Sequence, residues 1–506
     1  MTSKLLFVLL LTSVGFGQSI ANESPTNWNE QTANNTSASS SFPGLKTNPA
    51  NIGAQTPVPV PRPANTNFAD VRSLLYAGST TKIIWHMQPW FGKSQAGTVT
   101  TPNGVMTASN GHIIVGYDQN DPAQIARQVN RMLAAGGYSI LLNWYGNRDS
   151  KQARNLTNST AIANYLTGCF TTTCPLRMGM MIDKGAFSSV CPKGPRDQKK
   201  CIITELEALF DYINAHYANK PWYLKRGTKN VAAFFIHEAD WKDTDWNSNT
   251  GVWATVKAYT NGYATPFEYW FEDEGDAACW KHVASDGCYA FMNPPRWDVA
   301  KQLLITEGEN YYPGFYQQAK AHSGMAALGM LKAGFDDNNA SWGTNRVSAR
   351  RCGQEFLDTA GIVNSNYSRS TQLEFVGIML NDYEEGTAVE SGIDNCLTVS
   401  ASIAGNSLHW TINKIDPTFA TTATVNRLKI YFSDPVSGTF HTALDNITPS
   451  PTGTQVLTSI IPPGNWKIWV QIVGQPLMMN HLIDSGISYS GGQRRSLSSQ
   501  ASSSPK

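Results

Sequence analysis

Eight short apolar runs in the middle of the chain constrain its fold more than any other feature. Their hydrophobic residues are consecutive rather than alternating. The runs are KIIWHM (82–87), YSILLNW (138–144), RMGMMID (177–183), VAAFFIH (231–237), TPFEYWF (265–271), CYAFM (288–292), AALGMLK (326–332) and FVGIML (375–380). Continuous hydrophobicity indicates strands that are buried on both faces, as in a parallel sheet.

Helical patterns separate these runs. In DPAQIARQVNRMLAAGG the apolar residues share one helix face, Pro122 stands in the first turn and glycines end the helix. CIITELEALFDYINAHY gives a second clear pattern, and weaker ones cover 252–259, 296–304, 311–322 and 345–359. Buried strands with interleaved helices predict an α/β fold, a (β/α)8 TIM barrel over residues 75–396. A doubly wound open sheet is the alternative, but no GxGxxG follows any strand.

The pattern changes after Cys396. The segments LTVSASIAGNSLHWTI, RLKIYFSD, GTQVLTSII and GNWKIWVQIVG alternate apolar with polar residues, and Gly, Pro and Asn turns separate them. Such alternation is typical of antiparallel strands with one buried face. It predicts a small C-terminal antiparallel β-sandwich of immunoglobulin or fibronectin type III character over residues 397–488.

Both ends of the chain carry segments without a core-forming pattern. The N-terminus has one Lys and an apolar run from Leu5 to Val14, which is typical of a secretory signal peptide, residues 1–21. Residues 22–74 are rich in Asn, Ser, Thr and Pro and predict a disordered linker, and residues 489–506 predict a disordered tail. No later segment reaches about 18 uninterrupted apolar residues. We therefore expect a secreted protein, extracellular or periplasmic, that is not held in a membrane.

Eight cysteines fit an oxidising compartment. No CxxC occurs, so a zinc or redox site is not expected, and we predict no metal and no cofactor. Connectivity is not deducible from sequence. Proximity alone suggests the pairs Cys169–Cys174, Cys191–Cys201, Cys279–Cys288 and Cys352–Cys396.

The charge of the chain disfavours some partners. Lys plus Arg number 39 and Asp plus Glu 38, so no net field favours nucleic acid or an anionic membrane. The chain has 15 Trp and 19 Tyr but only 15% charged residues. That balance suits either a neutral, hydroxylated partner such as a sugar, whose ring faces stack on aromatic side chains, or a Trp-rich core. We expect a monomer that binds a polysaccharide or oligosaccharide.

The last apolar run ends in an unusual cluster of acids. In GIMLNDYEEGTAVE (377–390), Asp382, Glu384, Glu385 and Glu390 follow the strand closely. Carboxylates can simply cap a helix N-terminus. However, an acid beside a buried strand end must be desolvated, and this costs stability unless the site uses it. We favour a functional pair, Asp382 and Glu385.

The other strand ends are also rich in polar and aromatic residues, and function in a barrel gathers at these ends. Candidate substrate-binding residues are His86, Gln88, Trp90, Asn143, Trp144, Tyr145, Asp183, His237, Glu238, Trp241, Asp336, Asn381, Tyr383 and Glu390. Alternatives remain for several. A lone histidine such as His86 or His237 is more often a structural residue than a ligand-binding one. Trp90 and Trp144 could belong to the hydrophobic core at the rim of the barrel. The FDDNN run (335–339) could be a calcium loop or a solvated turn, of which we favour the turn.

Two carboxylates three residues apart among aromatic residues suit glycoside hydrolysis. One acid that its surroundings keep protonated can protonate a leaving oxygen, and an ionised partner can assist the displacement. No Ser–His–Asp order, P-loop or HExxH supports a rival chemistry.

The motif NDYEEGTAVE resembles the eighth-strand motifs of two glycosidase families. Glycoside hydrolase family 71, the α-1,3-glucanases, has Asn-Asp-Tyr-x-Glu-Ser. Family 99, the endo-α-mannosidases and mannanases, has Asn-Glu-Trp-x-Glu-Gly-Thr-x-Ile-Glu. It also has Pro-Trp-Tyr-Gly at its first strand, which QPWFG resembles. DPAQIARQVNRMLAAGGYSILLNWYG is similar to the helix and strand that follow in family 99.

The resemblance covers roughly residues 80–395 and implies an endo-acting glycoside hydrolase of α-linked glucan or mannan, retaining or inverting. It makes Asp382 and Glu385 the catalytic carboxylates, with Glu385 the better general acid and Asp382 the base or assisting carboxylate. Family 99 has Glu at the position of Asp382, and the Ser-His that follows the family 71 acid is missing. A non-catalytic carbohydrate-binding barrel is the main alternative, and an exported structural or adhesion protein is a further one.

Overall fold

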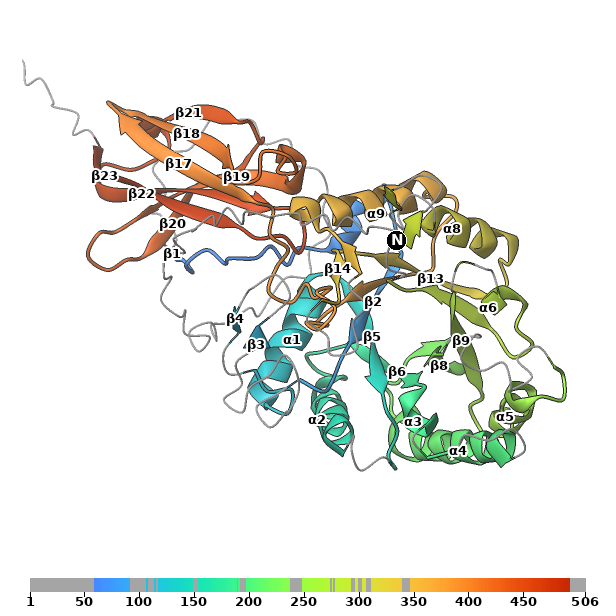
Figure 1. Cartoon of the computed structure of the whole chain (residues 1–506). Coiled ribbons are helices and arrows are strands. Elements are labelled where there is room, and N and C mark those ends of the chain that lie inside the picture. The colour runs from blue at the N-terminus through green and yellow to red at the C-terminus, as the bar shows by residue number, and fades with distance from the viewer. Residues whose placement is uncertain are drawn as a thin grey trace, which may run out of the picture. The chain divides into compact units, whose positions relative to one another are not determined.

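A computed structural model gives the fold (Figure 1). It describes residues 59–91, 106–107, 113–114, 117–148, 153–188, 190–191, 197–236, 248–273, 275, 278–292, 296–298, 303–305, 311–338 and 346–491. All of these belong to one compact unit.

A closed barrel of parallel strands forms the larger part of this unit. Its strands in chain order are β2 (Lys82–Met87), β5 (Gly137–Trp144), β6 (Arg177–Asp183), β8 (Lys229–Phe235), β9 (Phe267–Asp273), β10 (Gly287–Ala290), β13 (Ala326–Leu331) and β16 (Phe375–Met379). Neighbours pair in parallel throughout, β16 pairs with β2, and β6 pairs with β8. The short strand β7 (Lys225–Arg226) adds an antiparallel edge to β8. The predicted barrel is confirmed, and each of its strands overlaps one of the eight apolar runs.

Helices follow most of the strands. They are α1 (Pro122–Ala134), α2 (Ala153–Cys169), α3 (Gly185–Ser188), α4 (Asp197–Ile213), η4 (Asn214–Ala218), α5 (Val252–Thr260), α6 (Ala278–Lys281), α8 (Tyr312–Ala321) and α9 (Gln354–Asn366). Helix α1 begins as its sequence predicts, because the Asp121 side chain accepts the N–H of Ala123 and Pro122 is the first helical residue. Helix α2 lies outside the helical patterns identified in the sequence.

Two of the weaker helical patterns do not form helices as expected. Residues 296–304 contribute instead to an antiparallel hairpin of β11 (Arg296–Asp298) and β12 (Leu303–Ile305), where backbone pairing overrides the helical spacing. In 345–359, helix α9 starts only at Gln354. Before it lie the turn η6 (Arg351–Gly353) and strand β15 (Val347–Ser348), which pairs with β14 (Phe335–Asp336). Strand β3 (Met106–Thr107) pairs in antiparallel fashion with β4 (Ile113–Ile114).

The C-terminal part contains two antiparallel sheets, with the orders β1-β20-β19-β22-β23 and β17-β18-β21. Their strands are β1 (Pro59–Val60), β17 (Leu397–Ala404), β18 (Ser407–Lys414), β19 (Val425–Ser433), β20 (Phe440–Ile447), β21 (Thr452–Val456), β22 (Gly464–Gly474) and β23 (His481–Gly491), with the turns η7 (Thr422–Thr424) and η8 (Leu457–Ser459). Residues of both sheets, such as Leu408 and Ile468, share one apolar cluster. The immunoglobulin or fibronectin type III character of this part stays a prediction.

The end of the predicted linker belongs to the folded part. Strand β1 pairs with β20, Asn67 donates its backbone N–H to Met478, and residues Val71–Leu74 form the turn η2. A polar composition predicts a linker here, but composition does not show that the backbone finds partners hundreds of residues away. Strand β23 likewise runs three residues into the predicted tail. The predicted signal peptide, residues 22–58 of the predicted linker and residues 492–506 of the predicted tail lie outside the described residues.

The four disulfides join the cysteines in the predicted pairs, Cys169–Cys174, Cys191–Cys201, Cys279–Cys288 and Cys352–Cys396. The last one links the turn before helix α9 to the residue before strand β17. Within the described part of the chain, every helix is too short or too polar to span a bilayer.

Candidate active site

The acidic motif follows strand β16 as a tight loop. The N–H groups of Val389 and Glu390 both donate to the carbonyl of Leu380, and those of Thr387 and Ala388 both donate to the carbonyl of Asp382. Position 386 is a glycine with φ 59°, a left-handed conformation in which a side chain would be strained. The loop therefore returns on itself and holds both acids of the predicted pair directly at the end of the strand.

Asp382 is the more firmly held of the two acids. Its side chain is almost fully buried, and its carboxylate accepts the Glu385 N–H at 2.9 Å and the Gln88 side-chain amide at 3.2 Å. Burial raises the pKa of Asp382 to about 7, the negative charge of Glu384 adds to this rise, and both hydrogen bonds oppose it. These donors favour the ionised form of an otherwise poorly solvated acid.

Glu385 is half-buried and differently placed. Its backbone carbonyl accepts the Asp336 N–H at 2.7 Å, so strand β14 fixes its backbone. Burial raises the pKa of Glu385 well above its usual value, the charges of Asp382 and then Glu272 raise it further, and the guanidinium of Arg346 opposes the rise. Among the described residues, no hydrogen-bond donor to its carboxyl group favours ionisation. Burial and a neighbouring carboxylate raise the pKa of both acids, and among the described residues only Asp382 has hydrogen-bond donors to its carboxylate that oppose the rise.

A second group of predicted residues lies beside Asp382. The Asn143 amide donates to Asp183 at 3.4 Å, and the Tyr145 hydroxyl also bonds to Asp183. The pKa of Tyr145 is raised by burial, then by the charge of Asp183, with a smaller contribution from Asp382. Trp90 contacts the Tyr145 ring edge-on at a centroid distance of 5.7 Å. The structure thus brings the ends of β2, β5, β6 and β16 together, as the barrel predicts.

A series of buried hydrogen bonds connects Asp382 to Gln88, Asn381 and Tyr117. Asn381 bonds to both backbone groups of Gln88, each at 2.8 Å, and donates to the Tyr117 hydroxyl at 3.0 Å. The Gln88 side chain in turn donates to Asp382. Asn381 therefore holds Gln88, which holds Asp382.

Glu390 lies further along the same network. It accepts hydrogen bonds from Tyr117, Tyr383 and Gln128 at distances of 2.8–3.0 Å. Burial raises the pKa of Glu390, whereas its hydrogen-bond donors oppose the rise. Its carboxyl group is thus surrounded by side chains of the protein.

These contacts support a positioning role for three of the predicted substrate-binding residues, namely Asn381, Tyr383 and Glu390. The sequence patterns do not reveal their partners Tyr117 and Gln128. One signal was available. Gln124 and Gln128 lie four residues apart, on the face of α1 that also carries its apolar residues, and both are buried.

Two other predicted residues lie in the core, as their alternatives anticipated. His86 is fully buried, its ring lies 5.5 Å from that of Phe291, and burial lowers its pKa to about 3, so it is neutral. Trp144 is also fully buried and stacks on Tyr212 of helix α4 at 5.9 Å. Because Tyr212 belongs to the helical layer, Trp144 points away from the barrel interior.

Within the FDDNN segment, Phe335 and Asp336 form strand β14, residue 338 lies in a turn, and residue 339 lies outside the described residues. The Asp336 carboxylate accepts the Asn338 N–H at 3.0 Å, and the fully buried Asp337 accepts both the backbone N–H and the guanidinium of Arg346. Among the described residues, no cluster of His, Cys, Asp or Glu could hold a metal ion. The predicted site residues His237, Glu238 and Trp241 lie outside the described residues.

Comparisons with known proteins give weak similarities. No family model and no curated protein matches the chain. Among solved structures, a GH99 endo-alpha-mannosidase from Bacteroides thetaiotaomicron is similar at 15% identity and a TM-score of 0.41, over 61% of this chain and 87% of that one. The same enzyme with bound BIS-TRIS-propane is similar at 16% identity and a TM-score of 0.42, over 61% of this chain and 86% of that one. A glycoside hydrolase-like protein is similar at 10% identity and a TM-score of 0.43, over 72% of this chain and 93% of that one.

Proposed function

We propose that this chain is a secreted glycoside hydrolase that cleaves α-linked polysaccharide of the glucan or mannan class, and that it acts within the polymer. The observation that carries the proposal is the pair of carboxyl groups after β16, which differ in hydrogen bonding although they lie three residues apart. Asp382 has two donors that favour its ionised form, whereas burial and the neighbouring charge raise the pKa of Glu385, which favours its protonated form.

The proposed chemistry follows from this difference. Glu385 donates its proton to the glycosidic oxygen as the bond to the anomeric carbon breaks, so the leaving sugar departs as a neutral alcohol. Asp382, ionised, either takes a proton from the water whose oxygen forms the new bond to the anomeric carbon, or first assists the displacement at that carbon, after which water forms the bond and returns a proton to Glu385. The side chains of Trp90, Tyr145 and Asp183 contact the sugar beside the pair. The motifs shared with families 71 and 99 support the same assignment.

The four disulfides support export to an oxidising compartment, which is where an exported enzyme meets polysaccharide. The proposed catalytic domain is the barrel. The C-terminal β-sandwich is proposed as an accessory domain that contributes no catalytic residue.

A reducing-end release assay tests the proposal. The full chain is incubated with α-1,3-glucan, α-mannan, α-1,4-glucan and a β-glucan, beside the double variant Asp382→Asn, Glu385→Gln. We expect new reducing ends from one α-linked polymer, with the wild type only. No release from any of the polymers, with retained binding to one, would favour the non-catalytic carbohydrate-binding alternative.

A further inference from the structure

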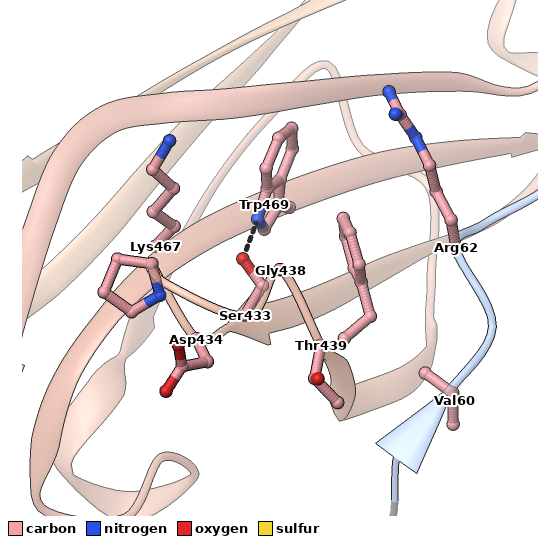
Figure 2. Close-up of a pocket in the computed structure, with 10 residues that line it drawn as sticks. Val60, Arg62, Ser433, Asp434, Gly438, Thr439, Lys467 and Trp469 are labelled. Carbon is pink, nitrogen blue, oxygen red and sulfur yellow. Dashed lines mark hydrogen bonds between the residues drawn. The ribbon is translucent and has the colours of Figure 1, made fainter.

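A pocket of about 470 Å³ lies on the C-terminal part of the chain and has no role in the proposed reaction (Figure 2). It opens on the face of the five-stranded sheet that is turned away from the apolar cluster. Along β22, Ile468 and Val470 belong to that cluster, whereas Trp469 between them lines the pocket. The alternation of side chains along a strand therefore places Trp469 on the outer face.

An aromatic surface forms part of the pocket lining. Trp469 is half-buried, and its ring packs on that of Phe440 at a centroid distance of 5.2 Å. Its indole N–H donates to the Ser433 hydroxyl at 2.9 Å, as Figure 2 shows. The ring is thus fixed in position with its polar atom already bonded. What it offers a ligand is its ring face.

The N-terminal segment completes the pocket. The Gln471 amide donates to the Ala64 carbonyl at 3.2 Å, so the segment covers the next outward-facing position on β22. Val60 and Arg62 of the same segment line the pocket instead of filling it. The pocket lies where this segment meets the end of β19, the loop that leads to β20, and β22.

The charges around the pocket balance. Arg62 and Lys467 bring two cations, and Figure 2 shows them on either side of Trp469. Asp434 also lines the pocket, and the N–H groups of its loop bond to its carboxylate at 2.8 Å, which favours its ionised form. The Lys467 ammonium lies 3.9 Å from Asp484. Two cations and two carboxylates give no net charge that would select an acidic ligand.

We propose that this pocket is a second, non-catalytic binding site for a neutral hexose polysaccharide. The pyranose ring stacks its C–H face on Trp469, and the charged side chains at the rim bond to the ring hydroxyls. Pockets of this size that combine an aromatic surface with a few polar groups are typical of small-ligand sites. If the barrel is a polysaccharide hydrolase, binding at this pocket raises the local concentration of polymer at the barrel, so this consequence rests on the proposed function.

Polymer binding by the full chain tests the site apart from catalysis. The background is the variant Asp382→Asn, Glu385→Gln, which removes turnover, and the probes are α-1,3-glucan, α-mannan and α-1,4-glucan in affinity gels. We expect one polymer to retard the chain and Trp469→Ala to weaken that retardation by about tenfold, since aromatic anchors dominate binding energy. Phe419→Ala changes an exposed aromatic residue outside the pocket, and this matched control should bind as the parent does.

Two further measurements separate the interpretations. Arg62→Ala changes an exposed side chain, keeps the aromatic packing and should weaken binding by a few-fold even if Trp469→Ala loses its native melting transition. Raising the salt concentration from about 50 to about 500 mM should leave binding unchanged, because salt screens only charge pairs with the ligand. A steep loss with salt would mean an acidic ligand and overturn the proposal. Unchanged binding in both pocket variants, or no retardation by any of the three polymers, would overturn it as well.

The outcome for the barrel is distinguishable. Retardation of the chain that depends on Trp469, together with no hydrolysis by the wild type, would sustain this site and contradict the proposed function. Hydrolysis of soluble oligosaccharides that is unchanged in Trp469→Ala, without retardation by any polymer, would sustain the proposed function and contradict the binding site at this pocket.

Discussion

Two buried carboxyl groups, Glu355 at the start of helix α9 and Asp382 after strand β16, are stabilised in different ways. Both are almost fully buried. Glu355 lies 3.1 Å from the ammonium of the fully buried Lys332, and its other oxygen is paired with the guanidinium of Arg351. Asp382 has hydrogen-bond donors but no such ion pair among the described residues, and its neighbour Glu385 is another acid.

We propose that this difference separates a structural acid from a catalytic one. A buried ion pair offsets part of the desolvation cost of each partner, and we expect Glu355 and Lys332 to hold the end of β13 against α9 without acting in the reaction. A carboxyl group with a raised pKa and an acidic neighbour lowers the stability of the fold, and such groups cluster at active sites. Substitution of either acid tests this difference.

The largest expected effect is on the rate. Asp382→Asn and Glu385→Gln should each lower kcat by about 10²–10⁴, because each removes one half of the acid and base work. An aryl glycoside, whose leaving group needs little protonation, should partly rescue Glu385→Gln but not Asp382→Asn. Steady-state kinetics on both substrate types checks this.

Glu384→Gln is the control for this pair, and its kcat should change little. Wild-type activity in either Asp382→Asn or Glu385→Gln would make the motif structural, and the contrast with Glu355 would then fail.

The reverse result is expected for Glu355. Glu355→Gln removes the negative charge 3.1 Å from the buried Lys332 and should lower the free energy of unfolding by about 3–5 kcal/mol. The kcat of the folded fraction should stay near that of the wild type. Denaturant unfolding and kinetics corrected for the folded fraction measure the two quantities. A loss of kcat at unchanged stability would show that Glu355 acts in the reaction.

An effect of a few kcal/mol is expected in the dependence of stability on pH. The folded pKa of Asp382, about 7, exceeds its ordinary value of 3.8, so the folded state holds the proton more tightly. The contribution of Asp382 to stability is therefore present at low pH and is lost as the pH rises through this window, at about 1.4 kcal/mol for each pH unit. As the pH rises from 3.8 to about 7, the free energy of unfolding of Asp382→Asn should therefore increase relative to that of the wild type.

Unfolding curves of both proteins at the two ends of the window measure this change. A constant difference in their free energies of unfolding would place the pKa of Asp382 near its ordinary value.

The smallest change in stability is expected in the hydrogen-bond network that connects Tyr117 and Asn381 to Asp382. Tyr117→Phe removes the hydroxyl that bonds to Asn381, Gln128 and Glu390 and should cost about 1–3 kcal/mol of stability. Asn381 positions the Gln88 amide, which lowers the pKa of Asp382. A looser Gln88 should therefore raise that pKa and move the acidic limb of the pH–rate profile to higher pH.

Tyr431→Phe is the matched control, because its buried hydroxyl bonds to Gln471 in the C-terminal sheet. That variant should lose stability without any change in the pH–rate profile. Equal profiles in both variants would limit Tyr117 to a structural role.

Sequence patterns predicted the barrel strands and the first helix, and proximity along the chain suggested the disulfide pairs without fixing them. Strands buried on both faces need continuous apolar runs, and the cap and proline of α1 act within one turn, so both signals are local. The disulfides followed from proximity along the chain. The sequence also placed Asp382 beside Glu385 after β16, because residues three apart in one loop cannot separate far.

The direction in which the other side chains face, and the distant groups that they meet, depend on tertiary packing. A pattern does not say whether Trp144 packs on the helical layer or faces the substrate, since both faces of a parallel strand are apolar. The sequence analysis counts Glu390 among the candidate substrate-binding residues. Its hydrogen-bond partners Tyr117 and Gln128 lie 273 and 262 residues away, so no local pattern reveals them. For the same reason the pocket at Trp469 could not be foreseen, because part of its lining comes from a segment whose composition suggests only a linker.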